Sequence, residues 1–261
     1  MLFDAHNHIQ DERLCKRLGE VLSRASQAGV TRMASCASGI GDEWTRLQKI
    51  AEDNPGCVFA NFGLHPWHVD SAPIGWKRGL EHRLAALPSG IGETGLDKAA
   101  RVAAPIEDQI KAFRWQLDLA LERGLPVSIH CVKAWGLVVE QLRARPGLRF
   151  MLHAYGGTAE LARELTALGA YLSFGSALTD PRRSTAAQAL HAVAPDRLLL
   201  ETDAPDGFRT TTNAGTEQNN ETSEPATLVR VRDAAAKLLD EPPEEIEKRS
   251  FDNAARFFQS M

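Results

Sequence analysis

The chain has 261 residues, close to the roughly 250 residues of a typical α/β barrel, and this length favours a single domain. Hydrophobic residues make up 43% and charged residues 25%, so the composition excludes disordered and fibrous classes. The net charge of −4 excludes a general positive field that would attract nucleic acid or an anionic membrane, and an anionic substrate must therefore be held locally.

The spacing of the cysteines and the lack of long apolar stretches indicate where in the cell the protein is located. The N-terminal residues lack the basic start and apolar middle of a signal peptide, and no stretch approaches the ~18 apolar residues of a membrane span. We therefore expect a cytoplasmic protein without a membrane span, and no obligate protein partner is evident. The four cysteines form no CxxC pair or disulfide framework, which favours a reducing environment: Cys15, Cys36, Cys57 and Cys131.

Eight short runs with β-strand character follow one another along the chain. Amphipathic segments separate the runs. The runs cover residues 2–6, 30–36, 57–63, 90–93, 126–130, 148–153, 170–175 and 197–203.

The segments between the runs have helical periodicity. In residues 106–124, Ile110, Phe113, Leu117 and Ala120 fall on one face, and Gly124 ends the pattern. Alternating strands and helices predict a parallel sheet, and eight such units favour a (β/α)8 TIM barrel over an open doubly wound sheet. We expect residues 1–261 to form one domain of this α/β class, with two last helical patterns, 224–240 and 242–258, completing the outer ring.

Residues 205–223 interrupt the alternation. This segment is polar, lacks periodicity and follows the eighth predicted strand directly. Loops of this length are uncommon unless they bind a ligand, cover a site or are disordered. We predict that it lies over the C-terminal face of the barrel.

Imidazole and carboxylate side chains occur at the ends of the predicted strands. His6 and His8 are two residues apart in a strand, so both rings point to the same side, and this HxH spacing allows both to bind one cation. The carboxyl ends of barrel strands meet at one face, where active sites of such barrels lie. A cation would also pair the charges of buried histidines and carboxylates. The predicted metal ligands are His6, His8, Glu93, His130, His153 and Asp203.

Five segments together resemble a known family, the TatD-type metal-dependent deoxyribonucleases of the amidohydrolase-like barrels. The resemblance spans nearly the whole chain, although Val132 stands where the family often has an arginine. The segments are DAHNH at 4–8, GLHPW at 63–67, IGETGLD at 91–97, PVSIHC at 126–131 and LLLETDAP at 198–205.

The resemblance implies a ligand arrangement. His6, His8 and Asp203 would hold one cation, His130 and His153 a second, and Glu93 would bridge the two. Such a pair of cations activates a water and stabilises charge on a phosphoryl or acyl oxygen. Asp203 is the candidate general base, and Glu93 is the second residue expected to act in catalysis. The cofactor is one or two divalent cations, with Zn, Mn, Mg and Ni all compatible with this ligand set.

The resemblance also implies a substrate, DNA, with hydrolysis of phosphodiester bonds from the 3′ end. A small phosphodiester or ester is a further possible substrate, and similar barrels hydrolyse amides, lactones and aminoacyl esters, which is the alternative function. A third hypothesis is a barrel that binds a metal or a partner without turnover, but all six ligand positions are filled here.

Four further residues are predicted to contact the substrate. His65 would touch the substrate or leaving group, or else fix the turn before Pro66. Gly156 and Gly157 precede a helix, so their N–H groups would receive an anion or simply form a tight turn. Lys133 would supply positive charge or be solvated. Arg209, in addition to these four, has the same two interpretations.

Cys131 and Trp67 have competing interpretations. Cys131 adjoins His130, a pairing that thiol catalysis uses, but strand alternation points Cys131 away from the barrel axis and favours a packing role. Trp67 is most simply a packing residue. If it is exposed beside the metal ligands, stacking on a nucleobase becomes the second interpretation.

Overall fold

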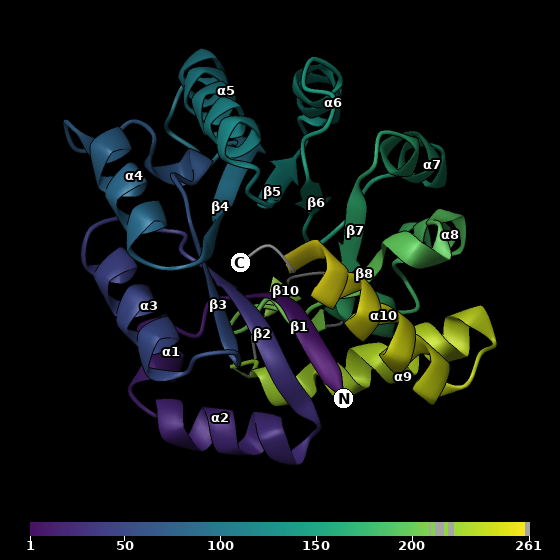
Figure 1. The fold of residues 1–261 in the computed structure, drawn as a ribbon. Helices are drawn as coiled ribbons and strands as arrows, with labels where there is room; N and C mark the ends of the chain where they lie inside the picture. Colours follow the sequence, from purple (N-terminus) through teal and green to yellow (C-terminus); the bar gives the residue numbers. More distant parts are fainter. Residues whose placement is uncertain (209, 212–216, 219–221, 259–261) are drawn as a thin grey trace.

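The computed structural model describes residues 1–208, 210–211, 217–218 and 222–258, and its centre is a ring of eight parallel strands (Figure 1). Each strand pairs with its neighbours in chain order, which confirms the predicted (β/α)8 TIM barrel. The strands are β1 (Leu2–Asn7), β2 (Val30–Cys36), β3 (Val58–Phe62), β4 (Ser89–Asp97), β5 (Val127–Val132), β6 (Phe150–Leu152), β7 (Tyr171–Phe174) and β8 (Leu198–Leu200).

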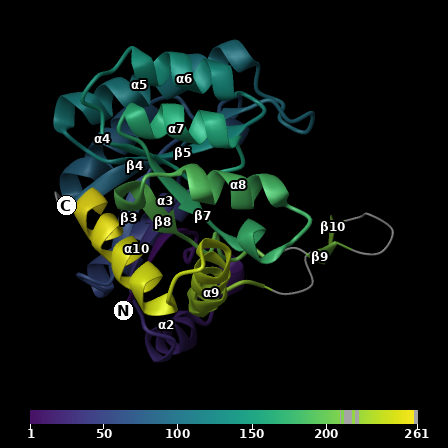
Figure 2. The same cartoon turned by 90° about the vertical axis from the view of Figure 1, so that its right-hand side faces the viewer.

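Helices surround this ring (Figures 1 and 2). In the segment around α5, Phe113, Leu117 and Ala120 are fully buried as predicted, and Gly124 ends the helix in a left-handed conformation at φ 65°. None of the helices within the described ranges combines the length and hydropathy of a membrane crossing. The helices are α1 (Glu12–Cys15), α2 (Leu18–Gln27), α3 (Asp42–Asp53), α4 (Trp76–Ala86), α5 (Ile106–Arg123), α6 (Trp135–Arg143), α7 (Ala159–Ala167), α8 (Ser184–Ala192), α9 (Leu228–Leu239) and α10 (Pro243–Phe258). Short 3₁₀ turns are η1 (Pro66–His68), η2 (Ser176–Thr179), η3 (Pro195–Arg197) and η4 (Pro225–Thr227).

The last helix differs from the prediction that it completes the outer ring. The end of α10 lies inside the circle of strands when the barrel is viewed from the side of the N-terminus (Figure 1). Phe257 and Phe258 are buried there in one apolar cluster with Phe3, and the ring centroids of Phe3 and Phe258 are 5.3 Å apart. The aromatic end of α10 therefore fills the N-terminal mouth of the barrel, where inward-pointing apolar side chains need a cover.

Backbone hydrogen bonds close the barrel between β1 and the segment after β8. Asp203 N–H donates to the His6 carbonyl at 3.0 Å, and His8 N–H donates to the Ala204 carbonyl at 2.7 Å. The buried Asp4 carboxylate supports this junction by accepting from the Thr202 backbone N–H at 2.9 Å. The closure places the predicted ligands of the first and eighth strands side by side.

Strand β4 extends past its predicted end at Glu93. After a register shift between Ile91 and Thr94, residues 94–97 pair with residues 129–132 of β5. Gly95, at φ 152°, makes this pairing possible, since a Cβ atom there would collide with the His130 carbonyl oxygen. The longer strand brings Asp97 to the same rim as Glu93.

The polar segment 205–223 contains two described strands, β9 (Thr210–Thr211) and β10 (Glu217–Gln218), which pair antiparallel. Figure 2 draws them on the side of the barrel opposite the chain termini. Other residues of this segment lie outside the described ones, so its predicted position over the C-terminal face stays a prediction.

Candidate metal centre

A cavity of about 840 Å³ opens at the C-terminal ends of the barrel strands. The structure brings all six predicted metal ligands together at its base, from β1, β4, β5 and the segments that follow β1, β6 and β8. Three groups of these and neighbouring side chains have ligand atoms within 4.8 Å of one another. They are His6 with His8 and Asp203, His6 with Glu93 and His153, and His65 with Glu93 and His130.

Glu93 is the centre of this cluster. Its Oε1 lies 2.9 Å from His130 Nδ1 and 2.8 Å from His153 Nε2. Its Oε2 lies 3.6 Å from His6 Nε2 and 3.5 Å from His8 Nε2. The two oxygens of one buried carboxylate therefore face two different pairs of histidines.

Asp203 completes the side of the cluster nearest β1. Its Oδ1 lies 3.3 Å from His8 Nε2 and 3.9 Å from His6 Nε2. The backbone of Asp203 has φ 51°, a left-handed conformation that non-glycine residues adopt at a cost and that often occurs at functional sites. The Asp203 side chain is 29% exposed, against 4% for Glu93, so a carboxylate oxygen of Asp203 reaches the cavity.

Hydrogen bonds on the far side of each ring orient three of the histidines. His8 Nδ1 donates to the Cys36 carbonyl at 2.6 Å, so the neutral ring has its lone pair on Nε2, the atom that faces the carboxylates. His6 Nδ1 lies 2.9 Å from Ser128 Oγ, and His130 Nε2 lies 3.3 Å from Asp97 Oδ2. Such outer partners are typical of metal-binding histidines because they select the tautomer and hold the ring.

The histidine nitrogens and carboxylate oxygens of the cluster form a dense group of acceptor atoms, and such a group suits a cation. The inward nitrogens of His6 and His8 are 3.3 Å apart, and those of His130 and His153 are 3.2 Å apart, so lone pairs face each other and the carboxylates. Burial lowers the pKa of His8, but the Asp203 and Glu93 carboxylates outweigh it and raise that pKa to about 9. The site therefore attracts positive charge, and imidazole with carboxylate suits Zn, Mn or Ni on chemical grounds.

His65 differs from the six predicted metal ligands in its hydrogen bonds. A backbone N–H can only donate, so the bond from Trp67 N–H to His65 Nδ1 at 3.2 Å leaves the His65 proton on Nε2. That atom lies 3.2 Å from Glu93 Oε1 and donates to it. Burial lowers the pKa of His65 to about 4, which keeps the ring neutral. His65 borders the cavity, and its contact with substrate stays a prediction.

Two buried carboxylates that the sequence interpretation missed support the cluster. Asp97 Oδ2 is hydrogen-bonded to His130 Nε2, and Glu201 Oε1 accepts from the Ala154 N–H at 2.6 Å and lies 3.7 Å from His153 Nδ1. Strand periodicity is the signal that would have found them. Asp97 is four residues after Glu93 and Glu201 two before Asp203, and both intervals keep the side chain on one face of an extended chain.

The remaining predicted substrate contacts lie in different surroundings. Lys133 is exposed, with φ 54°, and is not among the described residues that line the cavity. Gly156 borders the cavity. Gly157 is buried, and a Cβ atom there would lie 2.5 Å from the Tyr155 hydroxyl, so the close approach of Tyr155 favours a glycine here. Arg209 lies outside the described residues.

Positive charge at the cavity rim comes from residues that the sequence interpretation did not select. Four arginines border the cavity from three segments far apart in sequence: Arg46, Arg101, Arg182 and Arg183. The same lining also holds carboxylates, among them Asp11, Glu12 and Asp180, so both signs of charge border the cavity.

Cys131 is half-buried and packs against the apolar core as the strand alternation predicted, although it also borders the cavity. Burial raises the pKa of its thiol to about 12. A thiolate is the nucleophilic form, so this environment favours the packing role over thiol catalysis.

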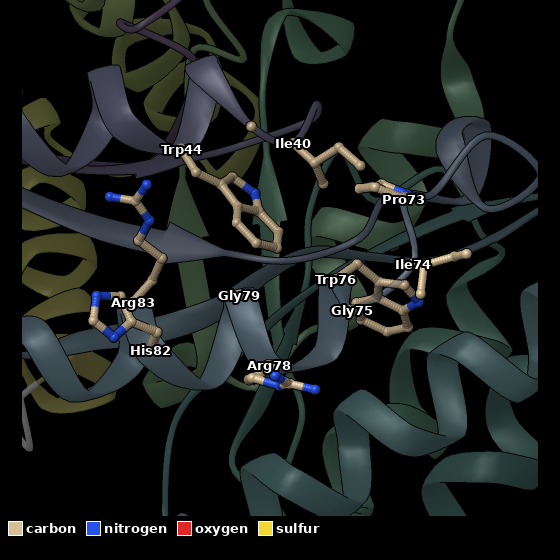
Figure 3. Close-up of a pocket in the computed structure, with 11 residues that line it drawn as sticks. Ile40, Trp44, Pro73, Ile74, Gly75, Trp76, Arg78, Gly79, His82 and Arg83 are labelled. Carbon is tan, nitrogen blue, oxygen red and sulfur yellow. The ribbon is translucent and has the colours of Figure 1, made fainter.

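A second hollow, of about 620 Å³, lies on the outer surface between the start of α3 and the start of α4 (Figure 3). Its lining includes Trp44, Pro73, Ile74 and Trp76 and is mostly apolar. It is separate from the barrel mouth, so the histidine and carboxylate cluster identifies the other cavity as the candidate site.

Comparisons with known proteins identify the family of this chain. The family model described as TatD related DNase matches residues 3–259. The "3'-5' ssDNA/RNA exonuclease TatD" of Cronobacter sakazakii is 33% identical, with 98% of this chain and 97% of the relative covered. The "Uncharacterized metal-dependent hydrolase YabD" of Bacillus subtilis is 31% identical, with 99% of each chain covered.

Solved structures include a similar chain over its whole length. The crystal structure of YJJV, a TatD homologue from Escherichia coli, superimposes with a TM-score of 0.87 at 27% identity and covers 99% of this chain and 98% of that one. The predicted resemblance is thereby confirmed. Since the family model covers almost every residue, this chain belongs to the family of TatD-related DNases.

Proposed function

We propose that this protein is a divalent-metal-dependent hydrolase that removes nucleotides from the 3′ end of single-stranded nucleic acid. One observation carries the proposal: the two carboxylate oxygens of Glu93 face two separate pairs of histidines at the base of an open cavity. The names of the relatives, a 3′–5′ exonuclease of single-stranded DNA and RNA and a metal-dependent hydrolase, support the choice of reaction.

This set of donor atoms suits one or two divalent cations. His6, His8 and Asp203 would hold one cation, and His130 and His153 a second, with Glu93 shared between them. A bound cation of this kind activates a water and stabilises negative charge on a phosphoryl oxygen. Ser128, Cys36 and Asp97 hold three of the imidazole rings in the orientation that binding requires.

Asp203 is the proposed general base. Burial opposes its ionisation, but the neighbouring histidines, with His8 the nearest, hold the pKa of Asp203 below its usual value. The carboxylate is therefore ionised and, through its exposed edge, can accept the proton of a water in the cavity. Glu93 is less exposed and faces only histidine nitrogens on both oxygens, so its proposed part is to hold and space the ligands.

The substrate backbone is proposed to lie against the basic rim. Arg182 and Arg183 border the cavity from the segment before α8, and Arg101 borders it from the loop after β4. Guanidinium groups bind phosphate with paired hydrogen bonds. Arg182 also pairs with Asp180 at 2.8 Å, which holds its side chain at the rim.

The test uses the intact protein, stripped with a chelator and reloaded with Mg, Mn, Zn or Ni separately. A single-stranded oligonucleotide labelled at its 5′ end should shorten in single-nucleotide steps in at least one metal. Asp203→Asn and Glu93→Gln should each lower the rate by at least about 100-fold, which is within the range of acid–base effects. Asp53→Asn is the matched control, because Asp53 is exposed on α3 and pairs only with Lys49 among the described contacts.

Two results would contradict the proposal. One is intact oligonucleotide in every metal while an aminoacyl ester, lactone or amide is cleaved, which would favour the alternative substrate class. The other is unchanged activity in Asp203→Asn and Glu93→Gln, which would remove the cluster from the mechanism.

A further inference from the structure

Trp67 is exposed at the cavity, whereas the tyrosine and phenylalanine side chains that line it are buried. Trp67 in η1 is 43% exposed, whereas Tyr155, Phe174 and Phe208, the tyrosine and phenylalanine rings of the lining, are 2%, 1% and 9% exposed. An indole ring is among the largest apolar surfaces a protein has, and its exposure beside a polar cluster leaves part of that surface open to solvent.

The ring lies directly beside His65 and the proposed metal ligand His130. The ring centroid of Trp67 is 4.8 Å from that of His65 and 6.3 Å from that of His130, and both contacts are edge-to-face. A phosphate held at the His130 side of the cluster therefore has the rest of its nucleotide within reach of Trp67.

Hydrogen bonds fix the orientation of the ring. Trp67 Nε1 donates to Asp97 Oδ2 at 2.7 Å, and the same oxygen lies 3.3 Å from His130 Nε2. The Ala99 N–H donates to the other Asp97 oxygen at 2.7 Å, and Asp97 is 1% exposed. A buried, fully bonded carboxylate thus joins the indole to a proposed metal ligand and holds the ring ready for a ligand.

The face of the ring accepts a flat partner. The guanidinium carbon of Arg101 lies 4.9 Å from the Trp67 ring centroid, while the Arg101 side chain is 63% exposed and can move aside. The indole N–H is already used by Asp97, so the exposed part of Trp67 offers a π face and no free donor. Such a surface binds any nucleobase by stacking and does not read its identity.

We propose that the exposed face of Trp67 stacks against a nucleobase that flanks the scissile phosphate, with Arg101 moving from the ring to make room. The inference rests on the proposed nucleic-acid substrate. It adds that binding is indifferent to base identity yet is strengthened by the presence of a base. Trp67 is then a substrate-binding residue, and Asp97 is its positioning residue.

The first test measures binding without turnover. Metal-loaded protein is titrated with a short single-stranded oligonucleotide whose 3′ linkages are phosphorothioates, and tryptophan fluorescence is recorded together with anisotropy of a 5′ label. Stacking on a base quenches indole emission, so the protein and Trp76→Phe should be quenched. Trp76 is the matched control, since it lies in the outer hollow and packs edge-to-face on Trp115. Trp67→Phe should bind while losing that quenching.

The second test pairs protein variants with altered substrates. Trp67→Leu should weaken binding about 5- to 150-fold, the range that corresponds to one base–aromatic stack, whereas Trp67→Phe keeps most of the affinity. The unaltered protein should bind an oligonucleotide with an abasic position flanking the scissile phosphate more weakly than the intact one, by a similar factor. Trp67→Leu should bind the abasic and the intact oligonucleotide equally well. This comparison needs no change in the protein, so it holds even if one variant fails to fold.

The outcomes separate the two proposals. Equal affinity of the unaltered protein for intact and abasic oligonucleotides, or undiminished quenching in Trp67→Phe, overturns the stacking site while nucleotide release would leave the proposed function standing. Quenching and abasic discrimination without nucleotide release support the stacking site and overturn the proposed function. An absence of both binding and release overturns both.

Discussion

The Asp97 carboxylate lies 3.3 Å from His130 Nε2, on the side of the ring opposite the Glu93 oxygen that lies 2.9 Å from Nδ1. His130 is thus held between two carboxylates, one buried in the wall and one in the cluster. Carboxylate partners of this kind make a histidine a better metal ligand by orienting it and raising its basicity.

Asp97→Asn should therefore weaken metal binding about 10- to 100-fold, because the amide oxygen still accepts from His130 but carries no charge, while the amide NH2 no longer accepts from the Ala99 N–H. Competition with a chromogenic chelator measures the affinity. Asp118→Asn is the control, since Asp118 is an exposed carboxylate on α5 that pairs with Arg145. Equal affinities for Asp97→Asn and the control would contradict the role given to Asp97.

Metal should stabilise the folded protein. The ligands meet only after the barrel closes between β1 and β8, so a cation binds the folded chain and not the unfolded one. The melting temperature should rise with metal concentration. At a metal concentration of 100 times the dissociation constant, the free energy of unfolding should increase by about 2.7 kcal/mol. His8→Asn should reduce the shift and His191→Asn, an exposed histidine on α8, should not. A melting temperature independent of metal and chelator would exclude the predicted site.

The Cys131 thiol should resist alkylation at neutral pH. Its pKa is raised to about 12 by burial, so the thiolate fraction in the folded protein is smallest at low pH and keeps rising beyond the usual value of 9.0. Iodoacetamide labelling of the Cys131 peptide, followed by mass spectrometry, should grow about tenfold per pH unit with no plateau near pH 9. In urea the same peptide should label readily. Cys131→Ser should keep its activity, and loss of turnover with normal folding would restore the thiol hypothesis.

The aromatic end of α10 should matter for stability and not for chemistry. Phe257 is fully buried at the N-terminal mouth, so Phe257→Ala should lower the free energy of unfolding by about 3 to 5 kcal/mol, the usual range for a buried phenylalanine. Urea unfolding measures the change. Metal content per folded molecule should stay the same, because the cluster lies at the opposite mouth. A small decrease in the free energy of unfolding, or a lower metal content per folded molecule, would contradict the assignment of stability to the N-terminal mouth and of chemistry to the opposite one.

The sequence by itself determined the alternation of strands and helices, and with it the barrel. Periodicity is local, so runs such as 30–36 and the apolar face of α5 were readable without knowing their neighbours. The ends of the predicted strands also located the six candidate ligands, because each stands at or just past such an end.

The tertiary structure decided what no local pattern contains. Residues 94–97 continue β4 because β5 offers backbone partners across a register shift, and this brings Asp97 to His130. Phe257 and Phe258 turn into the barrel mouth because that mouth is apolar, whereas helical periodicity alone equally suits the outer ring. The first and eighth strands of the barrel meet only in space. The exposure of Trp67 and the separate contacts of the two Glu93 oxygens follow from the closure of that ring. Such distances are set by packing rather than by spacing along the chain.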